Sequence, residues 1–359
     1  MSSDDSSSSS SLSPMLFDVL GSATAGVISR MVTHPLDTAK ARLQAPVAFT
    51  GGRPTTTFRG PADALLLTYQ REGIRALYAG FGAVIIGGTP GTVLYLTGYE
   101  YFRDSISSVV MKWNEGNETT SAERKNNKPS LSPVQEFSVY VSSGILAEAL
   151  ACIIYVPVDV VKERMQVQQK VGASQNYQYN GSWDALRQII RTEGMRGIYK
   201  GYGATLASFG PFSALYFMFY EQCKLWSKEY IHQQSQDIET RNRVTVKDGE
   251  LPLIHLVACS AGSGALASWL TSPLDMAKLR LQVQRGKAAT AASITGDGMS
   301  QHTEQYRGMI DCLRAAYREG GIRGLYRGAG ARVLHFAPAM TITMTCYEKF
   351  RAFYAEALG

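Results

Sequence analysis

A ten-residue element with the pattern P-x-D-x-x-K-x-R-x-Q occurs three times in this chain of 359 residues. The copies begin at Pro35, Pro157 and Pro273, at nearly equal intervals. Five residue types recur with identical internal spacing, which chance almost never produces. Self-similarity at a long fixed period indicates one structural unit that is used several times. The chain is therefore expected to fold as three related units.

Further landmarks repeat in phase with this element. An aromatic-x-Gly triplet follows each copy, a second triplet comes twenty residues later, and an aromatic-acid-x-x-base element ends the unit. Each unit is predicted to contain a long helix, a short amphipathic helix on a membrane surface and a second long helix. The short helices are predicted at 61–72, 182–193 and 308–319.

Membrane spans follow from the distribution of charge. Hydrophobic residues make up 45% of the chain and charged residues only 18%. Three uncharged stretches, Ala76–Tyr99, Gly201–Tyr220 and Leu251–Leu274, are long enough to cross a bilayer. Three further apolar segments carry Arg30, Glu148 and Arg332, which are costly in lipid unless they face a water-filled cavity. We predict an all-α membrane protein with six transmembrane helices in three pseudo-threefold repeats.

The repeats set the expected boundaries. A disordered Ser-rich tail is predicted over 1–14. The three repeats are expected at 15–110, 134–232 and 251–359, and polar linkers at 111–133 and 233–250. No role is assigned to the extra loop at 285–305.

Several classes of function are disfavoured by composition. The net charge of +6 is spread without a basic block, which argues against nucleic-acid binding. The five cysteines lack metal-ligand spacing, so neither a zinc site nor a disulfide framework is expected. No nucleophile with a base, phosphate loop or metal cluster is recognisable. An enzyme, a metal site and a cofactor are therefore not expected.

With the three P-x-D-x-x-K-x-R-x-Q copies and the three aromatic-acid-x-x-base elements, the chain resembles the mitochondrial carrier family from residue 15 to 357. The resemblance implies a monomeric, multi-pass solute transporter of the mitochondrial inner membrane, with plastids or peroxisomes as alternatives. It places the short helices on the matrix side, where an excess of basic residues agrees with it. It also implies membrane lipid as a partner, with cardiolipin at the glycine elements of the short helices.

The resemblance implies two gates that alternate. At the matrix gate, Asp37 is expected to pair with Lys162, Asp159 with Lys278 and Asp275 with Lys40, braced by Gln44, Gln166 and Gln282. At the cytoplasmic gate, Glu100 is expected to pair with Lys224, Glu221 with Arg351 and Glu348 with Arg103, braced by Tyr99, Tyr220 and Tyr347. The alternative is that these are surface ion pairs that contribute about 0–1 kcal/mol each.

Substrate contacts are implied midway along the even helices. The family positions correspond to Gly87, Gly88, Ser208, Phe209, Arg332 and Phe336. Arg30 and Glu148 either contact substrate or pair with each other, and His335 is either a proton site or a packed side chain. Two arginines and one glutamate suit a substrate with a carboxylate and an amine. The Gly87–Gly88 pair is expected to leave room for bulk, and Phe209 offers an aromatic face.

The third helix, from Ala147 to Lys162, resembles that of S-adenosylmethionine carriers. Those carriers place an acid where Arg30 stands, and a basic-acidic pair where Ser208 and Phe209 stand. The expected substrate is therefore either S-adenosylmethionine-like or an amino-acid-like zwitterion. A non-transporting membrane adaptor that retains the carrier fold is the alternative function, and the complete set of gate residues argues against it.

Overall fold

The structure is a computed structural model that describes residues 12–45, 58–117, 132–168, 179–239, 253–284 and 306–358. The described elements are helices joined by short turns. Most of the predicted tail (1–11), the centres of the two predicted linkers (118–131 and 240–250) and the loop at 285–305 lie outside the described residues.

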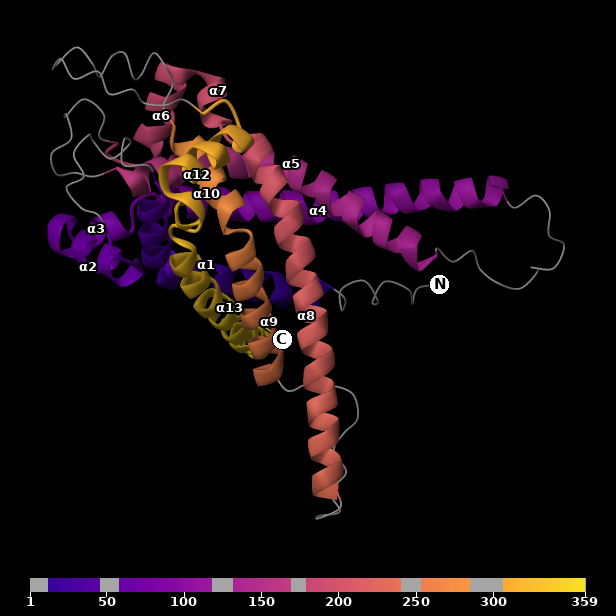
Figure 1. Ribbon diagram of the computed structural model, residues 1–359. Helices are drawn as coiled ribbons and strands as arrows, with labels where there is room; N and C mark the ends of the chain where they lie inside the picture. The colour runs from indigo at the N-terminus through magenta and orange to yellow at the C-terminus, as the bar shows by residue number, and fades with distance from the viewer. Residues whose placement is uncertain are drawn as a thin grey trace, which may run out of the picture.

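The three predicted units are present, each with a long helix, a short helix and a second long helix (Figure 1). The first contains α1 (Leu12–Gln44), α2 (Pro61–Glu72), α3 (Ile74–Leu77) and α4 (Phe81–Asn117). The second contains α5 (Pro133–Val167), α6 (Ser182–Glu193), α7 (Met195–Ile198) and α8 (Tyr202–Glu239). The third contains α9 (Leu253–Leu270), α10 (Ser272–Val283), α12 (Met309–Leu325) and α13 (Ala329–Leu358). The three-repeat, all-α fold is thereby confirmed.

The repeated prolines lie inside or at a break of the first long helix of each unit. Pro35 and Pro157 lie within α1 and α5, whereas the third unit breaks at Thr271 and bends by 65° between α9 and α10. Proline lacks the N–H that would bond the carbonyl four residues earlier. For Pro157 that carbonyl belongs to Ile153, and the Tyr199 hydroxyl donates to it at 3.0 Å. A side chain from the same repeat thus satisfies the freed backbone acceptor.

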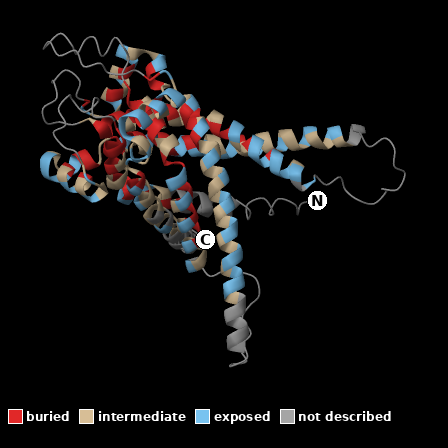
Figure 2. Cartoon of the chain, in the orientation of Figure 1, coloured by how far each residue is buried: buried red, intermediate tan, exposed pale blue. Residues whose placement is uncertain are grey.

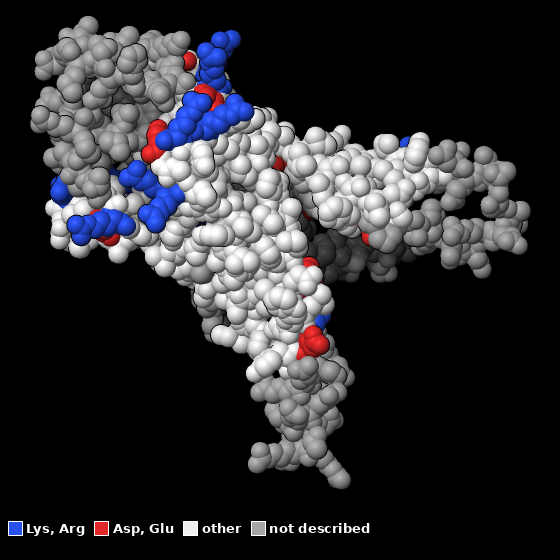
Figure 3. Space-filling view, viewed as in Figure 1, with Lys and Arg blue, Asp and Glu red and all other residues white. Residues whose placement is uncertain are grey.

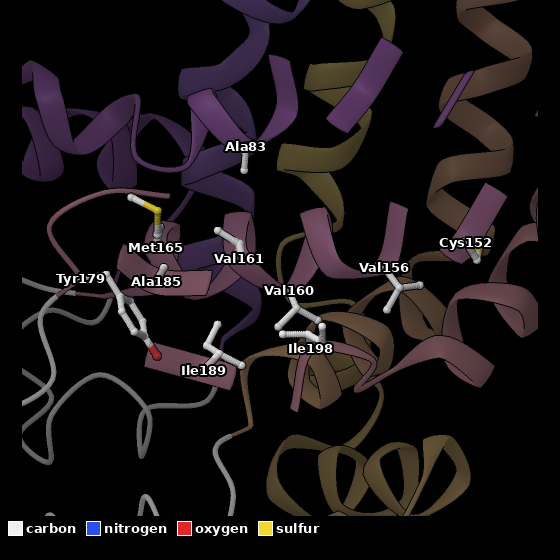
Figure 4. Close-up of a cluster of buried hydrophobic side chains, with 10 residues drawn as sticks. All are labelled: Ala83, Cys152, Val156, Val160, Val161, Met165, Tyr179, Ala185, Ile189 and Ile198. Carbon is white, nitrogen blue, oxygen red and sulfur yellow. The ribbon is translucent and has the colours of Figure 1, made fainter. Parts of the chain in front are cut away.

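The short helices have the predicted positions and attach to the long helices through apolar side chains. In the second repeat, Ala185 and Ile189 of α6 and Ile198 of α7 join a buried cluster with Val160 and Met165 of α5 (Figure 4). The one-turn helices α3 and α7 were not predicted. They follow glycines with positive φ, Gly73 and Gly194, and α12 contains the same turn at Gly321.

The long helices form two arms that diverge from the end bearing the short helices (Figure 1). One arm is the pair α4 and α5, which pack along each other. In the other, α1 packs along α13, and α9 lies between α13 and α8. Contacts between α1 and α4 are few, so the arms separate and the surface is hollowed where they meet (Figure 3). We refer to this hollow as the recess.

The surface of the arms suits a lipid environment. Many positions along them are exposed, drawn pale blue in Figure 2. Large apolar side chains are among the exposed residues; examples are Val93, Leu96, Phe137 and Phe217. By length and hydropathy, Ile74–Asn114 and Val134–Val167 qualify as spans, and the bent pair α9–α10 adds a third. The remaining predicted spans, in α1, α8 and α13, are interrupted by charged or weakly apolar residues, and their places in the repeat identify them. Lys and Arg gather at the opposite end, over the short helices (Figure 3).

Three helices extend beyond the predicted limits. α1 begins at Leu12, inside the predicted tail, and α4 and α8 continue to Asn117 and Glu239, inside the predicted linkers. At the end of the α4–α5 arm, the side-chain amides of Asn114 and Gln135 exchange two hydrogen bonds of 3.2 and 3.1 Å. Ser132 caps α5 at the same place. Polar contacts of this kind extend a helix past its apolar part, which hydrophobicity alone does not reveal.

Candidate functional site

Three ion pairs link the three repeats at the end of the recess nearest the short helices. Lys162 Nζ lies 2.8 Å from Asp37 Oδ2, and Lys278 Nζ lies 2.7 Å from Asp159 Oδ2. Lys40 Nζ lies 2.6 Å from Asp275 Oδ2, which completes the ring. The structure therefore brings together the partners that the sequence predicts. We refer to these six residues as the matrix gate.

Two side chains of α13 reach the matrix gate from the recess. Arg332 Nε lies 3.6 Å from Asp275 Oδ2, and His335 Nε2 lies 3.4 Å from Asp37 Oδ1. Arg332 also donates hydrogen bonds to Thr271 Oγ1 at 3.1 Å and to the Ser268 carbonyl at 3.3 Å. One helix thus connects the predicted substrate region to two of the three ion pairs.

The three glutamines do not brace these pairs in the way predicted. The amide of Gln44 is buried without a hydrogen-bond partner among the described residues, and Gln282 Nε2 donates to Thr205 Oγ1 at 3.5 Å. Gln166 Nε2 lies 3.4 Å from His34 Nε2. The reason is their packing: a Cβ on Gly328 or Gly201 would lie 2.7 or 2.8 Å from the Cγ of Gln44 or Gln282. These glutamines fill the space beside the glycine turns of the neighbouring repeat.

A second ring, which the sequence reasoning missed, lies next to the matrix gate. The arginine of each repeated element pairs with a glutamate at the end of its own short helix; the pairs are Arg42–Glu72 (2.5 Å), Arg164–Glu193 (2.5 Å) and Arg280–Glu319 (3.1 Å). Each arginine Nε also donates to the last turn of the next repeat's helix, at the carbonyls of Gln166 (3.0 Å), Gln282 (3.1 Å) and Gln44 (3.4 Å). We call this the arginine ring. The sequence does contain a signal for this ring, because a Glu-Gly dipeptide recurs at the same place in every repeat.

The predicted cytoplasmic pair Glu100–Lys224 is not formed. Lys224 Nζ instead lies 3.0 Å from Glu221 of its own helix, and Arg103 pairs with its neighbour Asp104 at 3.0 Å. Tyr99 stacks on Tyr95, and Tyr220 stacks on Tyr216. The side chains of Tyr347, Glu348 and Arg351 lie outside the described ones. The arms diverge at this end, which carries α4 and α8 apart.

Gly87 and Gly88 do not leave open room for a bulky substrate. The space that a Cβ of Gly87 would occupy is filled by the Val158 side chain, and that of Gly88 is filled by the Arg30 guanidinium. Gly87 therefore serves the packing of α4 on α5. Gly88 gives Arg30 a position against the α4 backbone. The sequence alone does not show whether the space beside a glycine is open or is filled by a neighbouring side chain.

Glu148 and Arg30 are not ion-paired with each other in the part of the chain that the structure describes. Glu148 is buried in α5 and accepts a contact of 3.6 Å from Cys152 Sγ. Tyr155, which the prediction omitted, lies within electrostatic reach of both charges, and its hydroxyl bonds Thr92 Oγ1 at 3.0 Å. Neither charged side chain is thus neutralised by the other.

The remaining predicted residues differ in what they can offer. Ser208 is buried and donates its hydroxyl to the Ala204 carbonyl of its own helix at 2.7 Å. Phe209 meets Tyr95 of α4 edge-on, with ring centroids 6.3 Å apart. Phe336 packs against Phe212 and Tyr216 of α8, and Arg332 lies over the Phe212 ring at 5.5 Å.

No metal centre is recognisable in the described ranges, where no three His, Cys, Asp or Glu side chains group closely enough to hold an ion.

Comparison with known proteins matches nearly the whole chain. The family profile described as mitochondrial carrier protein matches residues 12–109, 134–230 and 249–358. The mitochondrial substrate carrier family protein E of Dictyostelium discoideum is 31% identical over 96% of this chain and 97% of its own length. A probable chloroplastic S-adenosylmethionine carrier of Arabidopsis thaliana is 30% identical over 92% of this chain and 72% of its own length. The mitochondrial basic amino acids transporter of Bos taurus is 29% identical over 92% of this chain and 89% of its own length.

Proposed function

Because this chain belongs to the mitochondrial carrier family, we propose that it moves a carboxylate-bearing small metabolite across the mitochondrial inner membrane by alternating access. Membership makes the chain a solute carrier and a multi-pass protein of that membrane. The substrate class and the roles of individual residues are the parts proposed here.

The observation that supports alternating access is the difference between the two ends of the recess. At the matrix gate, three ion pairs of 2.6–2.8 Å join the repeats. At the far end, Lys224 and Arg103 pair within their own helices. This is the arrangement of a carrier that is closed to the matrix and open to the other side. In the opposite state, the same residues at the far end would pair between repeats.

Arg332 is proposed to couple substrate binding to the matrix gate. Its guanidinium is a good partner for a carboxylate, since it can donate two parallel hydrogen bonds. In this structure it is engaged with Asp275, Thr271 and Ser268. A substrate carboxylate that takes Arg332 removes one of the two ion-pair contacts of Asp275, and the contact with Lys40 remains. Binding would thereby weaken one ion pair of the gate, as differential binding to two states requires.

The other charges around the recess support a zwitterionic substrate. Arg30 is placed against Gly88 with its guanidinium free of an acidic partner among the described residues, and it can take a second anionic group. Glu148, which accepts a contact from the Cys152 thiol, can pair with an amine or another cation. The neighbouring rings of Tyr95 and Phe209, which meet edge-on, offer aromatic surface for a planar group. The class proposed is therefore S-adenosylmethionine-like or amino-acid-like zwitterions.

The test is a thermal-shift screen of the purified protein followed by uptake into liposomes. S-adenosylmethionine, aspartate, glutamate, glycine and arginine are the compounds to use first. A compound present at about 100 times its Kd should stabilise the native protein by about 2.7 kcal/mol. Wild-type liposomes should take up the stabilising compound, and Arg332→Ala should lose uptake while keeping its thermal stability.

The matched control is Arg323→Ala, which removes an exposed arginine of α12 and should transport normally. Unchanged uptake by Arg332→Ala would exclude the proposed role of Arg332. Absence of both stabilisation and uptake with every zwitterion would exclude the proposed substrate class.

We also propose lipid as a partner and a monomer as the transporting unit. Gly60, Gly181 and Gly308 begin the short helices without a side-chain cap, so backbone N–H groups are left for an anionic headgroup such as that of cardiolipin. Native mass spectrometry in mild detergent tests both statements.

A further inference from the structure

Five apolar residues pack together where the ends of α1, α5 and α10 meet, just beyond the matrix gate. They are Ala41, Ala45, Val167, Leu279 and Val283, and we call them the axial cluster. These residues stand one and five positions after the gate lysine of their repeat. The threefold pattern therefore defines six positions, of which five are apolar. The sixth position is Glu163.

The carboxyl group of Glu163 has no cation of its own. Its side chain is 14% exposed, and Oε2 is buried without a hydrogen-bond partner in the described part of the chain. Lys162 Nζ is 4.0 Å from Oε1, which is too long for a hydrogen bond, and Lys162 already donates to Asp37.

The charged groups that face Glu163 come from all three helices around it. α1 contributes Asp37 and Lys40, α5 contributes Asp159 and Lys162, and α10 contributes Lys278. Each of the three lysines is paired with an aspartate in the matrix gate. The three lysines and three aspartates of the gate balance one another, so a carboxylate at Glu163 would have no lysine of its own.

A buried charge without a partner is costly, by several kcal/mol in proteins generally. The side chains of the five axial-cluster residues are apolar and offer no hydrogen-bond donor to a carboxylate. A neutral carboxyl group, in contrast, fits this apolar layer.

We propose that Glu163 is a proton-binding site of the matrix gate, which holds a proton while the gate is closed and releases it to the matrix when the gate opens. Opening separates the ends of α1, α5 and α10 and admits water, in which a glutamate is an ordinary carboxylate. The carboxyl O–H bond breaks on opening, and the proton goes to matrix water. Closing takes one proton back from the same side.

Linkage gives the direction of the effect. The closed gate binds the proton more tightly than the open gate, so a rise in matrix pH shifts the population towards the open gate. One proton can change the ratio of closed to open molecules by at most about tenfold per pH unit. This proposal rests on the proposed transport function in one respect: it takes the opening of the matrix gate to be a step of transport.

Hydrogen–deuterium exchange of the full chain in lipid nanodiscs, without substrate, tests this directly. Peptides that contain Lys40, Lys162 or Lys278 report on gate opening. After correction for intrinsic exchange, wild-type protection of the gate peptides should fall from about pH 6 to about pH 9, by up to about tenfold per unit. Infrared spectra of the wild type at the lower pH should also contain the C=O band of a protonated carboxyl group.

Two variants remove the proton site in different ways. Glu163→Gln keeps the shape of the side chain, and Glu163→Leu copies the residue that stands at this position in the third repeat, Leu279. In both, protection of the gate peptides should depend on pH less steeply than in the wild type. Glu229→Gln, which removes an exposed acid near the far end of α8, should behave as the wild type.

The proposal is overturned if wild-type protection is independent of pH, or if Glu163→Gln or Glu163→Leu keeps the wild-type dependence. If neither variant folds, a pH-independent wild type still overturns the proposal, and a protonated-carboxyl band in its infrared spectrum supports it. Failure to transport any metabolite would count against the proposed function and would leave this result standing.

Discussion

Replacing Glu193 with glutamine should destabilise the protein far more than the same replacement of Glu319. Both glutamates belong to the arginine ring, but their surroundings differ. The Arg164 and Glu193 side chains are 2% and 4% exposed, with 2.5 Å between Nη1 and Oε1. Arg280 is equally buried, whereas Glu319 is 52% exposed and its closest contact is 3.1 Å. Glutamine keeps the shape of the side chain and removes only its charge.

The expected magnitudes follow from this burial. Removing one partner of a buried ion pair costs about 3–5 kcal/mol, because the other charge is left uncompensated. An exposed partner contributes about 0–1 kcal/mol. Arg164 keeps its backbone acceptors at Gln282 and Gln284 in Glu193→Gln, so we expect the lower end, about 3 kcal/mol. Glu319→Gln should cost about 1 kcal/mol or less.

Thermal unfolding in detergent, followed by the fluorescence of a thiol-reactive dye or of tryptophan, measures the difference. Since 1 kcal/mol corresponds to roughly 2 °C in a chain of this size or somewhat smaller, Glu193→Gln should lower Tm by roughly 6 °C and Glu319→Gln by about 2 °C or less. Glu72→Gln should resemble Glu193→Gln, because the Arg42–Glu72 pair is also buried. Equal shifts for Glu193→Gln and Glu319→Gln would refute the reasoning from burial.

Three further predictions concern the gate, a glycine turn and acid pH. Asp159→Lys should abolish uptake and adding Lys278→Asp should restore part of it, because the two side chains lie 2.7 Å apart; equal activity in all three proteins would remove the pairing from the mechanism. Gly80→Ala should lower Tm more than Gly73→Ala. Both glycines have φ near +80°, but only at Gly80 would an added Cβ come within 2.9 Å of the Lys162 backbone. Similar losses of Tm in the two variants would show that this contact can relax. Burial acts to raise the pKa of Glu193, but the hydrogen bonds and charges of Arg164 and Lys200 outweigh it and hold that pKa below its usual value. The stabilising effect of the Glu193 carboxylate is therefore present above about pH 4 and is lost as the pH falls further. Below about pH 4, Tm of the wild type should drop more steeply with pH than Tm of Glu193→Gln. Parallel curves of Tm against pH would contradict this.

The contacts predicted most accurately from the sequence involve residues that recur in all three repeats. The pairing of Asp37 with Lys162, and of their equivalents, could be predicted from the repeats and the family they resemble, because identical spacing in three units implies one geometry. The positions of the short helices followed for the same reason, since each begins after a repeated glycine. Repetition specifies these features independently of hydrophobicity. Among the described residues, length and hydropathy identify at most three of the six predicted spans.

The predictions that the structure does not bear out concern residues whose contacts depend on a neighbouring side chain or on the conformational state of the carrier. Whether the space beside Gly88 is open depends on the Arg30 side chain, which reaches it from another helix. The pairing of Glu100 with Lys224 depends on whether the arms are together, and one sequence encodes both states. Glu163 was overlooked because it breaks the repeat, and repeats direct attention to what is shared.

The arginine ring has a consequence for how the molecule moves. Arg42 holds the second repeat, Arg164 holds the third, and Arg280 returns to the first. A closed circle of such contacts has no free end, so one repeat cannot tilt outward without straining the contacts to both of its neighbours. Motion at this end is therefore expected to be concerted. A solute that disturbs one ion pair of the adjoining matrix gate, such as Lys40–Asp275, can in this way displace all three repeats.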